Sequence, residues 1–417
     1  MKTFIKKALR KWTGMSLMLR IFIGLVIGTI LALTVPQLTG IAILGKVFVS
    51  ALKAIAPVLV FILVMASIAK ARTGLGPRFR SMILLYLSSS FIAALVAVVG
   101  SFLFPLTLTL GGETAMTETG EGPVGLSDVF THLLSHMVDN PMSAVVNANY
   151  IGILFWSIIF GVALKWKAGE NTIRVVDDFA EVVSLVVRWI IQFAPFGILG
   201  LVFGSVAEGG IEVFSTYGNL ILVLVGCMLF NALVSNPLLA FLLLRRNPYP
   251  LLFTCLKESG LNAFFTRSSA ANIPINMNLC KQLGLDPDFY SVSIPLGATI
   301  NMDGAAVTIT VMTMAVAHTL GMEVTFLSAL LLCVVATFGA CGASGVAGGS
   351  LLLIPMACSF FGFSNDVAMQ AVAIGFVIGV VQDSVETALN SSGDAFFTAT
   401  AEYYDEKRRS RKSRPSA

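Results

Sequence analysis

Residues 383–394, DSVETALNSSGD, lie in a long apolar segment and carry, besides three serines, five polar or acidic side chains: Asp383, Glu386, Thr387, Asn390 and Asp394. Their spacing of three, one, three and four residues places them within about one third of the circumference of an α-helix. An ionised carboxylate at the centre of a membrane helix costs roughly 2.5–3.5 kcal/mol. Residues 282–406 contain no Lys or Arg that would offset this cost. We therefore expect the stripe to bind cations that come and go, as in a cation-coupled carrier.

The composition is that of an integral membrane protein. Of 417 residues, 56% are hydrophobic and 12% are charged, and the mean hydropathy is +0.86. A soluble domain carries about 25% charged residues, so this chain has too few polar residues to cover a soluble surface. Long apolar runs without strand-like alternation favour helices. The six cysteines show no CxxC pairing and are expected to be free thiols that serve as small apolar residues.

Basic residues gather at both ends of the chain. Six lie within residues 1–20 and six within 407–414, whereas the first acidic residue is Glu113. The positive-inside rule makes both termini cytoplasmic, with 404–417 as a basic cytoplasmic tail. The first apolar run lacks a small-x-small cleavage site and is expected to remain as a membrane helix. The basic runs are expected to contact lipid at a cell (inner) membrane and no nucleic acid.

Hydropathy and loop charge predict six ordinary spans in the first part of the chain. Loops that contain Lys or Arg alternate with acidic loops, so the chain returns to the cytoplasm after the sixth span. The expected spans are 17–35, 42–69, 82–105, 147–166, 182–206 and 217–244. The family resemblance described below implies that residues 1–249 form mainly a scaffold for oligomerisation, while the third and sixth spans also contact the transport core.

Two later apolar segments are interrupted at their centres. Residues 250–281 are broken by the polar run 266–274, and residues 326–361 are broken by the Gly-rich run 339–350. Basic residues flank the first segment, which indicates entry from the cytoplasm, and the second lacks them, which indicates entry from outside. Both segments are therefore predicted to be re-entrant helical hairpins.

Each hairpin precedes a span with intramembrane acids, 289–320 and 366–403. Ser268 precedes Asp303 by 35 residues and Ser344 precedes Asp383 by 39. Such paired interruptions indicate an inverted repeat with a binding site at the membrane midplane. The predicted fold is an all-α integral membrane protein with about eight transmembrane helices and two oppositely oriented re-entrant hairpins. Residues 250–403 form the transport core of this fold.

The run Pro295–Gly304, PLGATINMDG, is expected to interrupt its helix. Asn, Asp and Gly are poor helix formers, and the freed carbonyls can bind Na⁺. The hairpin tips place helix N-termini near the midplane, where N–H groups favour an anion such as the α-carboxylate of an amino acid. Ser268 and Ser269 can add hydrogen bonds, and Arg267 can pair with an acid of the site.

Three motifs carry a resemblance to a known family: Arg267-Ser268-Ser269, the run 295–304, and Asn390-x-x-Gly393-Asp394. Together they resemble the signature of the dicarboxylate/amino acid:cation symporter family, which contains sodium-coupled glutamate, aspartate and neutral amino acid carriers. The likeness covers the C-terminal half strongly and the N-terminal spans weakly, and it is close to the bacterial sodium/serine-threonine symporters of the family. It implies a homotrimer with an elevator mechanism.

The resemblance implies roles residue by residue. Asp383 matches the acid that holds the amino group of the substrate, and Asn390 and the hairpin serines match the holders of its α-carboxylate. The implied substrate site comprises Arg267, Ser268, Ser269, Ala305, Ala343, Gly345, Asp383, Glu386, Thr387 and Asn390. The implied sodium sites comprise Asp394 with Gly297, Asn301 and Asn390; Asp303 and Asn301 with Tyr86, Ser89 and Ser90; and backbone at Thr299, Thr337, Phe338 and Ala340.

Two departures from the family pattern favour a neutral substrate. Carriers of acidic substrates have an Arg one turn after the acid that binds the amino group, and this chain has Glu386 there. Ala305 stands where those carriers commonly have Thr. An anionic side chain would be repelled by an ionised Glu386, whereas Glu386 and Thr387 can hydrogen-bond a hydroxyl. We expect transport of serine and threonine; alanine, cysteine, a dicarboxylate and proton coupling remain open alternatives.

Other functional classes have weaker support. Gly342-Ala343-Ser344-Gly345 with His318 has the form of a serine protease motif, but four residues of a Gly-rich stretch are a weak signal. His132 and His136 lack a third metal ligand, and a cation channel would not need the tip donors. We expect no enzyme activity and no cofactor other than sodium as the coupling ion.

Overall fold

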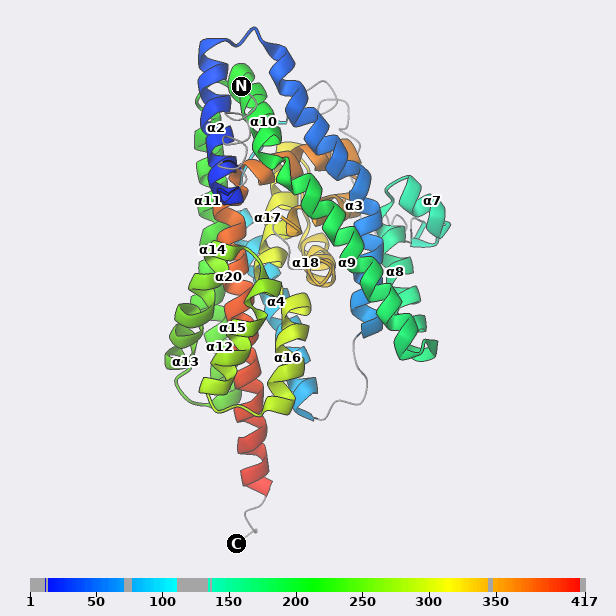
Figure 1. Cartoon of the computed structure of the whole chain (residues 1–417), viewed down its shortest axis with the longest axis vertical. Helices are drawn as coiled ribbons and strands as arrows, with labels where there is room; N and C mark the ends of the chain where they lie inside the picture. Colours follow the sequence, from blue (N-terminus) through cyan, green and yellow to red (C-terminus); the bar gives the residue numbers. More distant parts are fainter. Residues whose placement is uncertain are drawn as a thin grey trace.

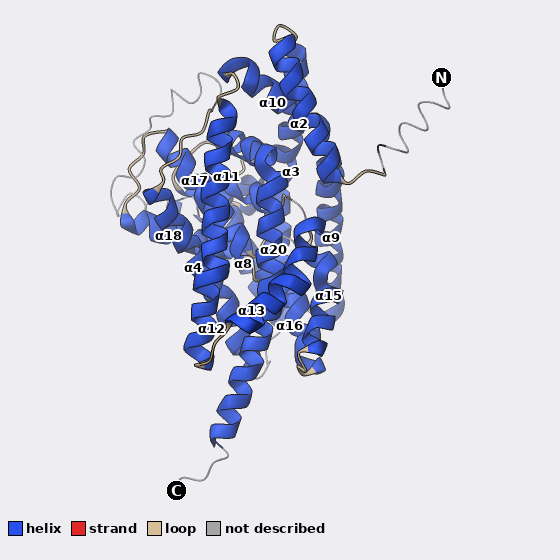
Figure 2. Cartoon of the chain, turned by 90° about the vertical axis from the view of Figure 1, so that its left-hand side faces the viewer, coloured by secondary structure: helices blue, strands red, loops and turns tan. Residues whose placement is uncertain are grey.

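The computed structural model describes residues 12, 14–70, 77–110, 134, 135, 137–343 and 348–412. Within these residues the chain forms helices joined by turns and contains no strand (Figures 1 and 2). The all-α class predicted from the composition is thereby confirmed for the described part of the chain. All six cysteines are described and are free thiols, as expected.

Several helices are long and apolar enough to cross a membrane. Among the described residues six qualify: Thr39–Lys70, Arg78–Leu103, Tyr150–Lys167, Val213–Leu244, Pro287–Thr319 and Asn365–Arg409. A bent pair of helices gives a seventh candidate, and the apolar helix at Leu19–Thr34 is shorter. The protein is therefore a multi-pass membrane protein. The full count of eight spans and the re-entrant character of the hairpins remain predictions.

The span expected at 182–206 is wrong as a single straight helix. The chain there forms α9 (Glu170–Gln192) and α10 (Ala194–Gly209), which meet at an angle of 53°. Pro195 lies in the first turn of α10, where its missing N–H is tolerated but a continuous helix is not. The apolar stretch 182–206 combines the end of α9 with most of α10, so hydropathy alone predicted one span.

One group of helices packs mainly within itself. It contains α2 (Leu17–Thr34), α3 (Ala42–Lys70), α8 (Tyr150–Lys167), α9 and α10. The short α7 (Pro141–Val146) precedes α8, and a 3₁₀ turn (Thr39–Ile41) precedes α3. Gly24 permits the close approach of α2 to α10, because a Cβ there would lie 2.2 Å from the carbonyl oxygen of Pro195.

A second group surrounds the last helix, α20 (Asn365–Lys412), which runs through the molecule to the C-terminal end (Figure 1). It includes α4 (Pro77–Leu103), α11 (Val213–Phe230) and α12 (Asn236–Leu244). A π-helical turn (Asn231–Ser235) joins α11 to α12. The chain of α16 (Pro287–Ile300) and α17 (Asp303–Thr319) is broken at Asn301 and Met302, as predicted. Every residue from Asp303 to Ala317 is buried.

The first interrupted segment folds as α13 (Tyr249–Cys255), a π-helical turn (Leu256–Gly260), α14 (Leu261–Thr266) and α15 (Ser269–Gln282). Arg267 ends α14 in the left-handed conformation, with φ of 50°. The amide of Asn272 donates to the hydroxyl oxygens of Ser259 and Ser391 at 2.8 and 2.7 Å. The amide of Asn276 donates to the Ser391 carbonyl at 2.9 Å. These bonds fix the segment against α20.

The second interrupted segment begins with α18 (Phe326–Ala340) and resumes with a 3₁₀ turn (Ser350–Leu353) and α19 (Ile354–Phe360). Residues 344–347, which include Ser344 and Gly345, lie outside the described residues. The segment contacts α17 and α20, so both interrupted segments meet the acidic stripe of the last helix.

Candidate substrate and ion site

The five polar residues of the α20 stripe are all buried, as their helical spacing predicts. Asp383 and Glu386 expose 4% and 5% of their surface, and Asp394 exposes none. The stripe faces the break between α16 and α17 and the ends of the two interrupted segments. Arg267 is 7% exposed and is the only buried Lys or Arg among the described residues. The site therefore carries more buried acid than base.

Asp383 lies between the two interrupted segments. A guanidinium nitrogen of Arg267 is 3.7 Å from Oδ2 of Asp383, which pairs the charges without a hydrogen bond. The backbone N–H of Gly348 donates to Oδ1 at 3.2 Å. Asp383 Oδ2 is buried without a hydrogen-bond partner, so it can accept a bond from a cationic group. The expected pairing of Arg267 with an acid of the site is present.

Glu386 lies one turn further along α20 and is anchored through one oxygen. Oε2 accepts hydrogen bonds from the hydroxyl of Thr308 at 2.7 Å, the hydroxyl of Ser350 at 2.8 Å and the amide of Gln382 at 2.5 Å. Thr387 donates its hydroxyl to the Asp383 carbonyl of its own helix at 2.7 Å. The anchoring of Glu386 was not predicted, because its donors come from three separate elements.

Asp394 has one bonded and one unbonded oxygen. The amide of Asn301 donates to Oδ1 at 3.0 Å and to the carbonyl oxygen of Asn390 at 3.0 Å. Asp394 Oδ2 and Asn301 Oδ1 are buried and have no hydrogen-bond partner. The hydroxyl of Tyr86 and Asp394 Oδ1 both approach Gly297 closely. Buried oxygen atoms without donors are suited to a hard cation.

Asp303 is surrounded by donors. The hydroxyls of Ser89 and Ser90 donate to its two oxygens at 2.5 and 3.0 Å, as the expected grouping requires. The amides of Asn231 and Asn236 donate to Oδ2 at 3.0 and 2.9 Å. Neither Asn was predicted, because both lie in an apolar span. The sequence signal that could have found them is two Asn residues five positions apart in an apolar span. They lie at a π-helical turn, and such turns are frequent at functional sites.

Two members of the expected Asp303 group have their hydrogen bonds elsewhere. Tyr86 contacts the carbonyl of Asp394 at 3.2 Å and the hydroxyl of Thr398 at 3.0 Å. Asn301 bonds to Asp394, as described above. The grouping of Tyr86 and Asn301 with Asp303 in one sodium site stays a prediction, and the hydrogen bonds add contacts of both residues with Asp394.

The remaining predicted residues lie near these groups or in backbone around them. Ser268 caps α15 by accepting from the N–H of Ala271 at 3.2 Å, and Ser269 is buried beside it. The oxygen of Asn390 accepts from the N–H of Gly304 at 2.7 Å. Ala305, Thr337, Ala340 and Ala343 are buried, Thr299 is half-buried, and the Phe338 ring is half exposed. Gly345 cannot be placed, since it lies outside the described residues.

The space beside the acidic stripe is small. A cavity of about 20 Å³ is lined by Asp383, Arg267 and Gly348, together with Leu17 of α2 and Ile191 of α9. It holds about one water molecule, so an amino acid can enter only if side chains or a segment move.

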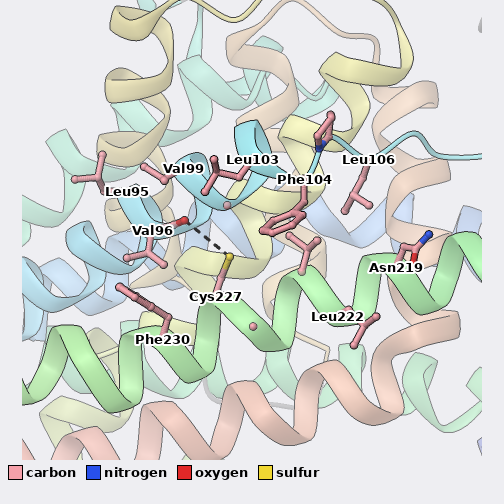
Figure 3. A pocket seen from close by; sticks show the side chains of 14 residues that line it. Leu95, Val96, Val99, Leu103, Phe104, Leu106, Asn219, Leu222, Cys227 and Phe230 are labelled. Carbon is pink, nitrogen blue, oxygen red and sulfur yellow. Dashed lines mark hydrogen bonds between the residues drawn. The ribbon is translucent and has the colours of Figure 1, made fainter.

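A larger groove lies apart from the acids. It measures about 890 Å³ and separates α4 from α11, with Leu95, Val99 and Leu103 facing Leu222 and Cys227 (Figure 3). Apart from the Cys227 thiol, the only polar side chain among the described residues that line this groove is Asn219. The groove lacks the charges needed to recognise an amino acid, so the site is assigned to the acidic stripe.

The structure leaves the serine-protease and His-metal alternatives untested, because their key residues are not among the described ones. No group of three His, Cys, Asp or Glu among them is arranged to hold a metal ion. His318 lies beside the ring of Phe102, with centroids 6.5 Å apart. Ser344, His132 and His136 lie outside the described residues.

The family model described as "Sodium:dicarboxylate symporter family" matches residues 17–403. The chain belongs to this family. It is 57% identical over 404 residues to "Serine/threonine transporter SstT" of Bifidobacterium adolescentis, covering 96% of this chain and 93% of the relative. It is 56% identical over 398 residues to the protein of the same name from Streptococcus thermophilus, covering 95% and 98%. These relatives of the symporter family are transporters and not enzymes, so the protease and channel hypotheses are set aside.

Proposed function

We propose that this protein is a symporter that couples inward sodium flow to uptake of serine and threonine. The observation that carries the proposal is the buried stripe of α20, where three acids face one Arg among the described residues. Membership of the symporter family and the printed names of its relatives support the same substrates.

The proposed substrate site lies between the ends of the two interrupted segments. The ammonium group binds Asp383, whose Oδ2 lacks a hydrogen bond. The α-carboxylate binds at Asn390 and at the N-terminus of α15, where Ser268 and Ser269 lie. The side-chain hydroxyl binds at Glu386, and a second carboxylate in the substrate would be repelled there. Serine and threonine meet these requirements better than a dicarboxylate does.

The proposed sodium sites use the oxygen-rich clusters. Asp394 and Asn301 present buried oxygens without donors, the Asn390 carbonyl lies 3.0 Å from the Asn301 amide nitrogen, and the Gly297 carbonyl accepts from the Asn301 backbone N–H at 2.9 Å. Asp303, with Ser89 and Ser90, supplies a second cluster. Backbone at Thr299 and Thr337–Ala340 would supply a third. Carboxylate, amide and carbonyl oxygens are the ligands that hard cations prefer, which favours sodium over a proton.

A sliding movement of the substrate-binding part is supported by an offset between helix groups. Lys53 of α3 forms an ion pair with Asp366, the second residue of α20. Lys53 lies 11 residues after Ala42, or roughly 16 Å along α3 at 1.5 Å per residue. If both helices begin at the outer surface, α20 begins level with the middle of α3. In Figure 1 the lower ends of α12, α15 and α16 correspondingly extend below those of α3 and α8.

We further propose that the movable part comprises residues 250–403 with α4 and α11–α12, and that the other helices form the scaffold of a homotrimer. Exposed apolar side chains on α9 support an oligomeric contact or a lipid contact: Val175, Phe179, Val182 and Trp189. Both termini are proposed to be cytoplasmic in a bacterial inner membrane, from the basic runs at each end.

The test is uptake of labelled serine into proteoliposomes under an inward sodium gradient, compared with potassium in its place. Unlabelled threonine and glutamate serve as competitors. We expect sodium-dependent accumulation that threonine blocks and glutamate does not. Uptake driven equally well by a proton gradient without sodium would overturn the ion assignment. Strong competition by glutamate would overturn the assigned role of Glu386.

A further inference from the structure

The carboxylate of Glu386 is held by three side chains, and each belongs to a different element. Thr308 is on α17, Ser350 begins the 3₁₀ turn after the second interruption, and Gln382 is on α20. All three are buried, with exposures of 0, 1 and 0%. Their polar atoms lie 2.7, 2.8 and 2.5 Å from the same oxygen, Oε2.

This convergence leaves the two oxygens of Glu386 unequal. A carboxylate oxygen has about two lone-pair positions, so three donors saturate Oε2, while Oε1 takes part in none of these bonds. The amide of Gln382 also lies 2.7 Å from the Thr308 hydroxyl, so the donors restrain one another. The backbone of α17 comes close, since a Cβ on Gly304 would lie 2.8 Å from the Glu386 Cα. The plane of the carboxylate is therefore fixed.

We propose that Thr308, Ser350 and Gln382 are positioning residues that set substrate selectivity by directing Oε1 of Glu386 toward the substrate hydroxyl. The inference rests on the proposed function and adds to it that serine is preferred to alanine. A site built to hydrogen-bond a hydroxyl discriminates against a ligand that lacks it, because its own polar group is then left unpaired. A freely rotating carboxylate would lose much of this discrimination.

Thr308→Val provides the sharpest test, because it keeps the side-chain shape and removes the hydroxyl. Thr313→Val is the matched control, because Thr313 is also buried on α17. The Thr308 hydroxyl lies 3.0 Å from the carbonyl oxygen of Gly304, four residues earlier, and the Thr313 hydroxyl has the same relation to Ile309 at 2.8 Å. We measure Vmax/KM for serine and for alanine in proteoliposomes. The ratio of the two should fall about tenfold in Thr308→Val, the equivalent of about 1.4 kcal/mol, and should stay unchanged in Thr313→Val.

Ser350→Ala repeats the test from the other interrupted segment, and it keeps the proposal falsifiable if Thr308→Val fails to fold. Its control is Ser359→Ala, because among the described residues the Ser359 hydroxyl bonds only to the Met356 carbonyl nearby, at 2.8 Å. Ser350→Thr restores a hydroxyl and should return the serine-to-alanine ratio toward the wild-type value. A purely structural role would lower uptake of both substrates together and leave the ratio unchanged.

A double-mutant cycle with Glu386→Gln tests whether Thr308 changes the serine-to-alanine ratio by acting through Glu386. If Thr308 acts through Glu386, then Thr308→Val should change the ratio little in the Glu386→Gln background. An undiminished change there, or an unchanged ratio in both Thr308→Val and Ser350→Ala, would overturn the inference. Failure of the proposed function appears separately, as an absence of sodium-driven serine uptake in the wild-type protein before any variant is compared.

Discussion

Gly297→Ala should damage the proposed sodium site at Asp394 without changing any charge. A Cβ on Gly297 would lie 2.8 Å from Asp394 Oδ1 and 2.8 Å from the Tyr86 hydroxyl. Ordinary contacts of a Cβ begin at 3.4 Å, so the two oxygens must each retreat by about 0.6 Å. Both side chains are fully buried and have little freedom to move. Metal–ligand distances tolerate changes of only about 0.2 Å, so ion binding should suffer.

The expected result is a rise of roughly tenfold or more in the sodium concentration that gives half-maximal uptake, equivalent to at least about 1.4 kcal/mol of ion binding. Because sodium and serine binding are linked, saturating sodium should recover much of the serine uptake. Alanine is a better helix former than glycine by about 1 kcal/mol, which offsets part of an overpacking cost of about 1–3 kcal/mol. The variant should therefore still fold.

The assay is sodium-dependent serine uptake in proteoliposomes, with thermal unfolding in detergent as a check on folding. Gly218→Ala on α11 is the control, because a Cβ there meets no atom within 4 Å. A folded Gly297→Ala protein with wild-type sodium dependence would refute the assignment of this oxygen cluster to sodium. Loss of uptake that no sodium concentration restores would indicate damage beyond ion binding.

Three further outcomes are expected. Asp383→Asn should reduce serine uptake at least a hundredfold, and serine should no longer raise the unfolding temperature; retained stabilisation by serine would exclude Asp383 as the ammonium ligand. The pair Lys53→Cys and Asp366→Cys should be cross-linked by a dithiol-reactive reagent and stop uptake until reduced, whereas uptake that continues in the cross-linked protein would contradict movement between α3 and α20. The hydrogen bond from Arg78 lowers the pKa of Asp286, so the pair stabilises the fold at pH values above the unfolded pKa of about 3.9, and this stabilisation is lost as pH falls through the lower folded pKa. Asp286→Asn should therefore lower the unfolding temperature at pH 7 but not below about pH 3, and an equal deficit at both pH values would contradict this role.

The parts of the site that the sequence predicts are those in which one helix carries the whole signal. The α20 stripe needs only helical spacing and the cost of burying charge. The break at Asn301 and Met302 follows from poor helix formers in one short run. The first interruption, at Arg267, follows from polar residues in the middle of an apolar segment. In each case neighbouring residues suffice for the prediction.

The parts that the sequence does not predict require contacts between distant segments. Asn231 and Asn236 reach Asp303 across more than 60 positions of the chain, and no local pattern marks them as partners. The hydrogen bonds of the Tyr86 hydroxyl to the Asp394 carbonyl and to Thr398 were likewise not predicted. The bend between α9 and α10 was missed for a different reason, because a hydropathy window averages over two adjoining helices.

The arrangement of hydrogen bonds offers a physical basis for coupling ion and substrate. Asn301 donates to the ion-site acid Asp394 and to the carbonyl of Asn390. Asn390 in turn accepts through its side chain from the N–H of Gly304, the residue after Asp303. A cation bound at Asp394 would hold the Asn301 side chain in place. Through its bond to the Asn390 carbonyl, Asn301 would then restrain Asn390, which is the proposed holder of the substrate carboxylate. Since the proposed ion sites at Asp394 and Asp303 both act on one residue of the substrate site, a carrier without its ions would hold that residue less firmly and bind serine more weakly.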